Sequence, residues 1–120
     1  MDTVFIFLET GFEEIEALAT IDVLRRGGVP IRSVSLTGEK VVTSGHQISV
    51  LADDMFEEIN VSEAQMLILP GGTVKINEHA GLKQTVCTFA QQGKLIAAIC
   101  AAPMVLGELG LLTALAGEFF

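Results

Sequence analysis

Val4-Phe5-Ile6-Phe7-Leu8 is a continuously apolar run, which is typical of a strand buried on both faces of a parallel sheet. Two further apolar runs, at residues 66–69 and 95–99, have the same character, and residues 31–36 predict another strand. Segments in which apolar residues recur at helical spacing lie between these runs. This alternation predicts an α/β fold in which helices cover both faces of a mainly parallel sheet.

The helix expected after the first strand carries several acidic residues near its start. Thr10 and Glu13 have the spacing of a capping box, and Glu13 and Glu14 fit a first turn, where carboxylates complement the helix dipole. Glu16 is expected to share a sheet-facing side with apolar residues, and such a carboxylate must be paired or protonated. The apolar residues of that side are Phe12, Ala19 and Val23.

Composition limits the classes of function. The chain has 120 residues, the length of about one domain, and its 15 acidic and 7 basic residues give a net charge of −8. Nucleic acids and anionic membranes attract basic surfaces, so we expect neither as a partner. The longest uncharged apolar stretch, between Lys94 and Glu108, is interrupted by Pro103 and is shorter than the ~20 residues of a membrane span. The first residues lack the basic region of a signal peptide, which predicts a cytoplasmic protein.

Both histidines and one of the two cysteines are weak candidates for catalysis. His46 falls in the turn of a hairpin predicted around Ser44-Gly45, and His79 falls near a helix start, so both are expected to be solvated. Cys87 is expected to be structural within that helix, and residues 53–62 predict an acidic loop or a short helix. No CxxC pair is present, so we predict no disulfide, no metal site and no cofactor.

Cys100 is the strongest candidate for a reactive group. It directly follows the predicted strand at 95–99 and precedes a helix in which Pro103 suits the first turn. Strand-to-helix turns of this kind hold enzymatic nucleophiles, and N–H groups at a helix start favour a thiolate. The small neighbours Ala101 and Ala102 leave room for a substrate. A buried, inert cysteine is the competing interpretation.

The carboxyl ends of the strands would bring Cys100, Glu16 and Gly71-Gly72 together, because ligands bind at that edge of open parallel sheets. A thiolate and a carboxylate repel each other, so an anionic Cys100 requires Glu16 to hold a proton and donate it to the sulfur as a hydrogen bond. The glycine pair allows close backbone approach, and its amides, with that of Ala101, fit an oxyanion hole. An ordinary tight turn after Pro70 is the alternative for the glycine pair.

Together these motifs resemble the DJ-1/PfpI (ThiJ) family, nearer its DJ-1/ThiJ branch. They occur in order and extend over nearly the whole chain. The matching stretches are Gly11-Phe12-Glu13-Glu14-Ile15-Glu16, Asp22-Val23-Leu24-Arg25-Arg26-Gly27-Gly28, Leu69-Pro70-Gly71-Gly72 and Ala98-Ile99-Cys100-Ala101-Ala102-Pro103.

The resemblance implies a flavodoxin-like three-layer sandwich that forms a homodimer. It also implies a nucleophilic, oxidisable Cys100, a protonated Glu16, and an oxyanion hole made by the N–H groups of Gly72 and Ala101. The expected function is a glyoxalase or deglycase that acts on small reactive aldehydes without a cofactor. The alternatives are an oxidative-stress sensor or chaperone, a PfpI-like amidase or protease, the thiazole monophosphate label of thiamine biosynthesis, and an inactive truncated fragment.

A flavodoxin-like cofactor or signalling module fits less well. The acidic loop at residues 9–16 would repel a flavin phosphate, and Pro70 stands where a receiver domain needs an aspartate. The chain also departs from the family at its end, because family domains run longer and many carry a later histidine that neither His46 nor His79 matches. Residues 114–120 do not resemble the family's continuation, so we expect one domain, 1–120, incomplete at its C-terminus.

Overall fold

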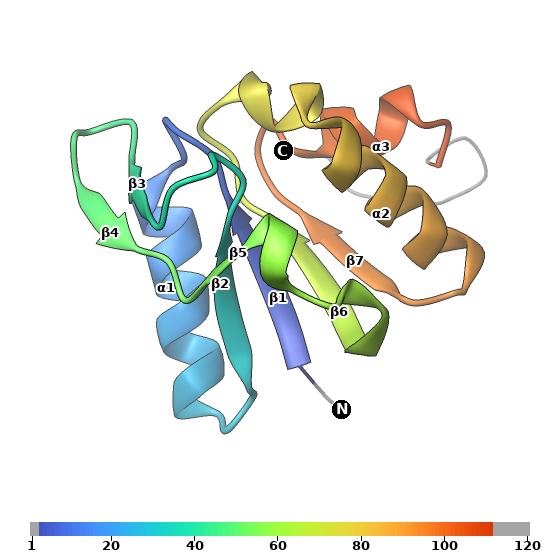
Figure 1. Cartoon of the computed structure of the whole chain (residues 1–120), viewed down its shortest axis with the longest axis horizontal. Coiled ribbons are helices and arrows are strands. Elements are labelled where there is room, and N and C mark those ends of the chain that lie inside the picture. Colours follow the sequence, from blue (N-terminus) through green and yellow to red (C-terminus); the bar gives the residue numbers. More distant parts are fainter. Residues whose placement is uncertain (1–2, 112–120) are drawn as a thin grey trace.

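The computed structural model describes residues 3–111, and its central feature is a five-stranded sheet (Figure 1). All four pairings in this sheet are parallel, so the predicted α/β class with a mainly parallel sheet is confirmed. The strands, in their order across the sheet, are β5 (Asp54–Met55), β2 (Ile31–Ser35), β1 (Thr3–Leu8), β6 (Ala64–Leu69) and β7 (Leu95–Ala98).

Helices cover both faces of the sheet and form the outer layers of a three-layer arrangement. Figure 1 shows α1 (Glu14–Arg26) on one side and both α2 (Ala80–Gln91) and α3 (Pro103–Glu108) on the other. None of the described helices has the length and apolar character that crossing a membrane requires. The smaller elements are the hairpin strands β3 (Val41–Thr43) and β4 (Ser49–Leu51) and the 3₁₀ turns η1 (Phe56–Glu58), η2 (Val61–Glu63) and η3 (Val74–Glu78).

The central strand β1 explains why the sheet needs both layers. Successive side chains of a strand point to opposite faces, and β1 is apolar at every position from Val4 to Leu8. Phe5 and Phe7 therefore pack in the core beneath α2 and α3, while Val4, Ile6 and Leu8 pack in the core beneath α1. Residues 4–8 are all buried. A continuously apolar strand thus requires cover on both faces, as the sequence predicts.

The start of α1 differs from the prediction. Glu13 is the N-cap, because its Oε1 accepts a hydrogen bond from the Ile15 N–H at 2.9 Å, and the helix begins at Glu14. The predicted capping box of Thr10 and Glu13 is therefore wrong. The physical reason is a turn at Gly11, where φ is +90° and the N–H donates to the Thr43 carbonyl at 2.9 Å instead of entering a helix.

The later start also changes which side of α1 faces the sheet. Ala17 is buried, and Ile21 and Leu24 pack against the same core. Ala19 is exposed, and 63% of Val23 is exposed, so the predicted sheet-facing side is wrong for both. The prediction counted helical spacing from Phe12. Phe12 is buried in the loop before the helix, so its position does not indicate which side of α1 faces the sheet.

Strand β5 lies in the segment predicted as an acidic loop or a short helix. It has only two residues, too few for a periodic pattern, and it pairs with β2 at the edge of the sheet. Polar contacts hold this edge: the Arg32 guanidinium contacts the Asp54 carboxylate at 2.6 and 3.1 Å. Asp54, in the segment predicted as an acidic loop or a short helix, therefore has a structural partner in Arg32.

Asp53 ties the same edge strand to the end of α1. Its Oδ2 accepts hydrogen bonds from the Ser33 N–H at 2.9 Å, the Ser33 hydroxyl at 3.2 Å and Arg25 Nη2 at 2.9 Å. Burial alone would raise the pKa of Asp53, but the Ser33 hydrogen bonds and the charges of Arg25 and Arg32 hold that pKa below its ordinary value. The folded state therefore binds this proton more weakly than the unfolded chain does.

We predict that Asp53→Asn lowers the free energy of unfolding by about 1–2 kcal/mol near pH 7, because charge-assisted hydrogen bonds to a part-buried carboxylate are lost. A depressed pKa contributes stability above the unfolded value of about 3.9, and this contribution disappears as the pH falls through the lower folded value. The wild-type protein should therefore lose more stability than the variant between about pH 5 and pH 2, as measured by urea denaturation.

Asp22→Asn is the matched control, because Asp22 pairs with Arg26 one turn away and its side chain is 60% exposed. An exposed pair of this kind contributes little, so this variant should match the wild type at each pH. Equal losses in both variants would contradict the role given to Asp53.

Candidate active site at Cys100

Cys100 lies in the turn that joins β7 to α3, as predicted. Its backbone has φ +61°, in the left-handed region that residues with a side chain seldom adopt. Such strain persists only where surrounding contacts enforce it, and it is concentrated at functional sites. The residue is exposed, whereas Cys87 is only partly exposed in α2, so the interpretation of Cys100 as a buried cysteine is wrong.

Gly71 marks the point where Glu16 and Cys100 meet. A methyl group built on Gly71 would lie 2.6 Å from the Cys100 Cβ and 2.7 Å from the Glu16 Oε1, so both groups border the same small space. The Gly71 N–H also donates a hydrogen bond to the Glu16 Oε1 at 2.9 Å. The structure therefore brings together the carboxyl group and the cysteine that the sequence predicts as partners, with the Gly71 backbone between them.

Gly72 provides the second close approach. Its φ is +103°, and an added Cβ would lie only 2.2 Å from the backbone nitrogen of Glu13 and 2.7 Å from the Phe12 carbonyl carbon. The neighbouring Gly71 carbonyl accepts a hydrogen bond from the Glu13 N–H at 2.9 Å. No other residue type fits this position, so the glycine pair is more than an ordinary tight turn after Pro70.

The two residues predicted to supply an oxyanion hole, Gly72 and Ala101, directly follow Gly71 and Cys100 in the chain. Among the described residues, the N–H groups of Gly72 and Ala101 donate no hydrogen bond, whereas the nearby Ala102 N–H is bonded to the Ile99 carbonyl at 3.1 Å. Both residues are next to the contacts described above, and neither Gly72 nor Ala101 is buried. Both N–H groups therefore lack a partner within the described part of the chain, as an oxyanion hole requires.

The three glutamates at the start of α1 have three different environments. Glu13 caps the helix, Glu16 accepts from Gly71, and Glu14 is buried with only 7% of its side chain exposed. Glu14 Oε1 lies 2.8 Å from the Nδ1 of His46, which is in the turn between β3 and β4. Glu14 lies in the first turn of α1, as predicted, and His46 lies exposed in the hairpin turn, as predicted; the contact between the two was not predicted.

The pKa of Glu14 lies below its ordinary value. The first cause is hydrogen bonding of the carboxylate with the backbone of Glu14 itself; burial opposes it, and the charge and hydrogen bonds of His46, with that of Ser44, add to the lowering. Glu14 is therefore an anion at neutral pH. No pattern in the sequence signalled this pair, because its two residues are far apart in the chain and meet only when the hairpin folds against the 11–13 loop.

His79 has a structural role. Its Nδ1 accepts a hydrogen bond from the Leu82 N–H at 2.9 Å, which caps α2, and its ring packs edge-on against Phe56 with centroids 4.8 Å apart. His79 is thus partly buried and not solvated as predicted. Within the described residues, neither histidine contacts Cys100 through a hydrogen bond or ion pair.

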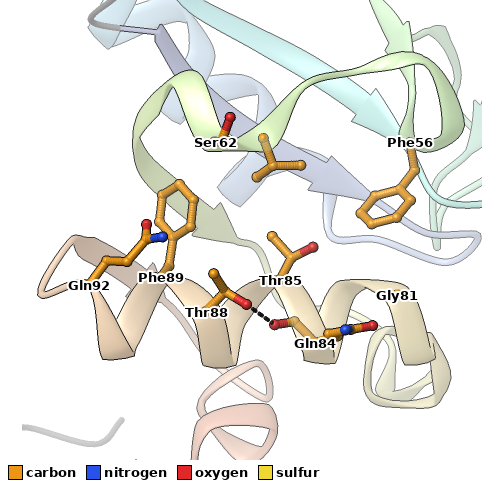
Figure 2. A pocket seen from close by; sticks show the side chains of 9 residues that line it. Phe56, Ser62, Gly81, Gln84, Thr85, Thr88, Phe89 and Gln92 are labelled. Atoms are coloured by element: carbon orange, nitrogen blue, oxygen red, sulfur yellow. Dashed lines mark hydrogen bonds between the residues drawn. The ribbon is translucent and has the colours of Figure 1, made fainter.

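A separate recess of 350 Å³ lies between α2 and the 3₁₀ turns η1 and η2 (Figure 2). Phe56 and Phe89 contribute its apolar surface, and neutral polar side chains such as Thr85 and Gln92 surround it. None of the residues gathered around Cys100 lines this recess. The chemistry described above is therefore confined to the carboxyl edge of the sheet.

The sequence profile of the DJ-1/PfpI family matches residues 2–116. The chain belongs to the DJ-1/PfpI family. This result confirms the resemblance inferred from the sequence, and the flavodoxin-like arrangement of the family agrees with the observed sheet and its covering helices.

Three DJ-1/PfpI relatives show how far the similarity extends. Protein DJ-1 homolog A of Arabidopsis thaliana is 37% identical over 92% of this chain, and the deglycase PfpI of Pyrococcus furiosus is 32% identical over 84% of it. The solved structure of oxidised DJ-1 from Toxoplasma gondii superposes on all of this chain with a TM-score of 0.92 at 32% identity. The chain spans 29%, 61% and 67% of these three proteins, respectively. The differences from the family expected at residues 114–120 lie outside the described residues.

We predict that Gly71→Ala separates Glu16 from Cys100 and destabilises the protein by about 1–3 kcal/mol, because the new methyl group overlaps both. The melting temperature and the rate of Cys100 alkylation by iodoacetamide should both fall. Thermal unfolding measures the first, and peptide mass spectrometry measures the second. Gly107→Ala in α3 is the control: its methyl group would meet nothing within 4 Å, so neither quantity should fall. An unchanged alkylation rate in Gly71→Ala would show that the glycine contact does not tune the thiol.

Proposed function

We propose that the protein is a cofactor-independent glyoxalase or deglycase that converts small reactive aldehydes through a covalent bond to Cys100. The observation that supports this most directly is the shared space at Gly71, which the Cys100 and Glu16 side chains both border. The exposed position of Cys100 and its left-handed backbone support the assignment of a nucleophile. The similarity to a relative named as a deglycase favours this class of reaction.

The proposed reaction begins with addition of the Cys100 thiolate to the aldehyde carbon of methylglyoxal. A carbon–sulfur bond forms, and the electron pair of the C=O bond moves to oxygen, beside the N–H groups of Gly72 and Ala101. Glu16, protonated at the outset, gives its proton to this oxygen and yields a neutral hemithioacetal. Protonated Glu16 avoids the repulsion that a second anion beside the thiolate would cause.

The Glu16 carboxylate then accepts the hydrogen on the former aldehyde carbon as a proton and returns it to the adjacent carbonyl carbon. The hydroxyl proton of the hemithioacetal passes to the oxygen of the neighbouring carbonyl, so the first carbon becomes the thioester carbonyl and the second carries the hydroxyl group. No external oxidant is needed, because one carbon is oxidised while its neighbour is reduced. Water cleaves the thioester and releases the hydroxy acid and the Cys100 thiolate. One proton from this step restores the acid form of Glu16, and general acid–base assistance of this kind contributes about 10²–10⁴ in rate.

We predict that Cys100→Ser abolishes methylglyoxal turnover, because a hydroxyl without a neighbouring base is a far weaker nucleophile than a thiolate. Glu16→Gln should lower kcat by about 10²-fold or more, since the amide cannot carry the proton between the two carbons. Formation of the hydroxy acid, followed by chromatography, measures both effects. Cys87→Ser is the control, because Cys87 lies in α2, and it should retain activity. Turnover that survives in Cys100→Ser would refute the proposed reaction.

A second candidate function is oxidation sensing by the same sulfur. The observation that favours it is the exposed Cys100 next to a carboxyl group that can hold an oxidised sulfur by a hydrogen bond. Here the thiolate attacks peroxide, a hydroxyl oxygen transfers to sulfur, and hydroxide leaves. A second equivalent of peroxide gives the sulfinic acid.

We predict that mild hydrogen peroxide adds two oxygens to the peptide containing Cys100 before it modifies the Cys87 peptide, as measured by mass spectrometry. The reason is the greater exposure of Cys100 together with its proposed thiolate character. Glu16→Gln should reduce the yield of the sulfinic form. Equal modification of both cysteines would eliminate the sensing function and leave the aldehyde reaction to be judged by its own assay.

The assembly and location of the protein are part of the same proposal. The family resemblance favours a homodimer, and exposed apolar side chains on α1 and the hairpin, including Ile15 and Leu51, support association of two copies. The cytoplasmic location stays a prediction from the sequence. The small aldehyde is the proposed substrate. The net charge of −8 speaks against nucleic acid or an anionic membrane as a partner.

A further inference from the structure

The start of α1 and the β3–β4 turn together form a cluster of potential metal ligands. Glu13, Glu14 and His46 each offer one ligand atom, and these three atoms lie within 4.8 Å of one another. Two backbone hydrogen bonds hold the turn in place: the Gly45 N–H donates to the Phe12 carbonyl at 2.9 Å, and the Gly11 N–H donates to the Thr43 carbonyl at 2.9 Å. The cluster is therefore built by the packing of the hairpin against the 11–13 loop.

An unpartnered buried oxygen points to a ligand at this cluster. Glu14 Oε2 is inaccessible to solvent and accepts no hydrogen bond from the described residues, although 93% of the Glu14 side chain is buried. A buried carboxylate oxygen without a partner is costly, and native proteins usually satisfy such atoms with a side chain, a water or an ion. The other oxygen, Oε1, contacts the His46 imidazole at 2.8 Å. The Glu14 carboxylate, with one oxygen paired and the other unpartnered, thus belongs to a cluster with two further potential metal ligands.

The charges and accessibility of the cluster favour a divalent cation. Two carboxylates bring negative charge to the cluster, which attracts a cation. His46 supplies a nitrogen ligand and is 78% exposed, so it gives a cation a path from solvent and can adjust its position. Glu13 already satisfies the first turn of α1 through Oε1, which leaves its second oxygen available. One imidazole and two carboxylates are a donor set suited to zinc, with water completing four-coordination.

We propose that Glu13, Glu14 and His46 bind a zinc ion that fastens the β3–β4 hairpin to the start of α1. The site is distinct from the space shared by Cys100 and Glu16, and it uses none of those side chains. Zinc there would satisfy the orphaned oxygen of Glu14 and join two segments that are otherwise linked by the backbone hydrogen bonds at Gly11 and Gly45. It would thereby stabilise the loop that packs against Gly72.

Calorimetric titration of the full chain with zinc chloride tests this site, and it is carried out in the Cys100→Ser background so that the thiol cannot bind the metal. We expect one zinc ion per chain and a higher melting temperature in its presence. His46→Ala should weaken zinc binding at least tenfold; His46 is an exposed turn residue, so this variant should fold. Glu13→Gln should weaken binding in the same direction and provides an independent check.

The controls are His79→Asn and Glu39→Gln in the same background. They remove the second imidazole of the chain and an exposed carboxylate outside the cluster, and asparagine preserves the N-cap of α2. Both should bind zinc as the parent does. Bound cobalt(II) should show the weak visible bands of nitrogen and oxygen ligands, without the near-ultraviolet charge transfer of a thiolate, in the chain that retains Cys100.

Three results would overturn the proposal. They are the absence of zinc binding in the Cys100→Ser chain, binding that His46→Ala and Glu13→Gln leave unchanged, and a thiolate–cobalt band that accounts for all bound metal. These outcomes are separate from the aldehyde assay, so failure of the metal site would leave the proposed reaction at Cys100 untouched.

Discussion

The close approach of two backbone segments at Gly71 and Gly72 is the constraint on which the site depends. The end of β6 meets the loop before α1 so tightly that a methyl group on Gly72 would overlap the Glu13 nitrogen, 2.2 Å away. A hydrogen bond from the Glu13 N–H to the Gly71 carbonyl fastens the same contact. Because no side chain separates the segments, the first turn of α1 can reach the carboxyl edge of the sheet, and Glu16 arrives beside Cys100.

The sequence motif that contains three glutamates illustrates how one helix start can serve three purposes. Glu13 satisfies the N–H of Ile15, Glu14 turns toward the hairpin, and Glu16 turns toward Gly71. Successive residues of a helix point about 100° apart, so neighbouring carboxylates necessarily face different surroundings. The three side chains are identical, so their different contacts follow from the directions in which they point.

Strain and exposure at Cys100 are the features on which both proposed reactions of its sulfur depend. The φ of +61° is maintained where β7 gives way to α3, and it presents the side chain at the surface. An exposed sulfur beside a carboxyl group is open to an aldehyde carbon and equally to peroxide. Both proposed reactions use the anionic form of this sulfur in the same arrangement of the protein. Relative rates would therefore decide whether an aldehyde or a peroxide reacts first.

The sequence by itself determined the α/β class, because apolar runs mark the buried strands. It also determined the grouping of Cys100, Glu16 and Gly71-Gly72, because the carboxyl ends of parallel strands meet at one edge of the sheet. It did not determine where α1 begins, since the turn at Gly11 depends on a hydrogen bond to the distant Thr43. For the same reason it missed the two-residue strand β5 and the Glu14–His46 pair, whose partners lie far away in the chain. Contacts between distant segments leave no periodic trace in a sequence, so only the packing of the hairpin and the sheet edge decided them.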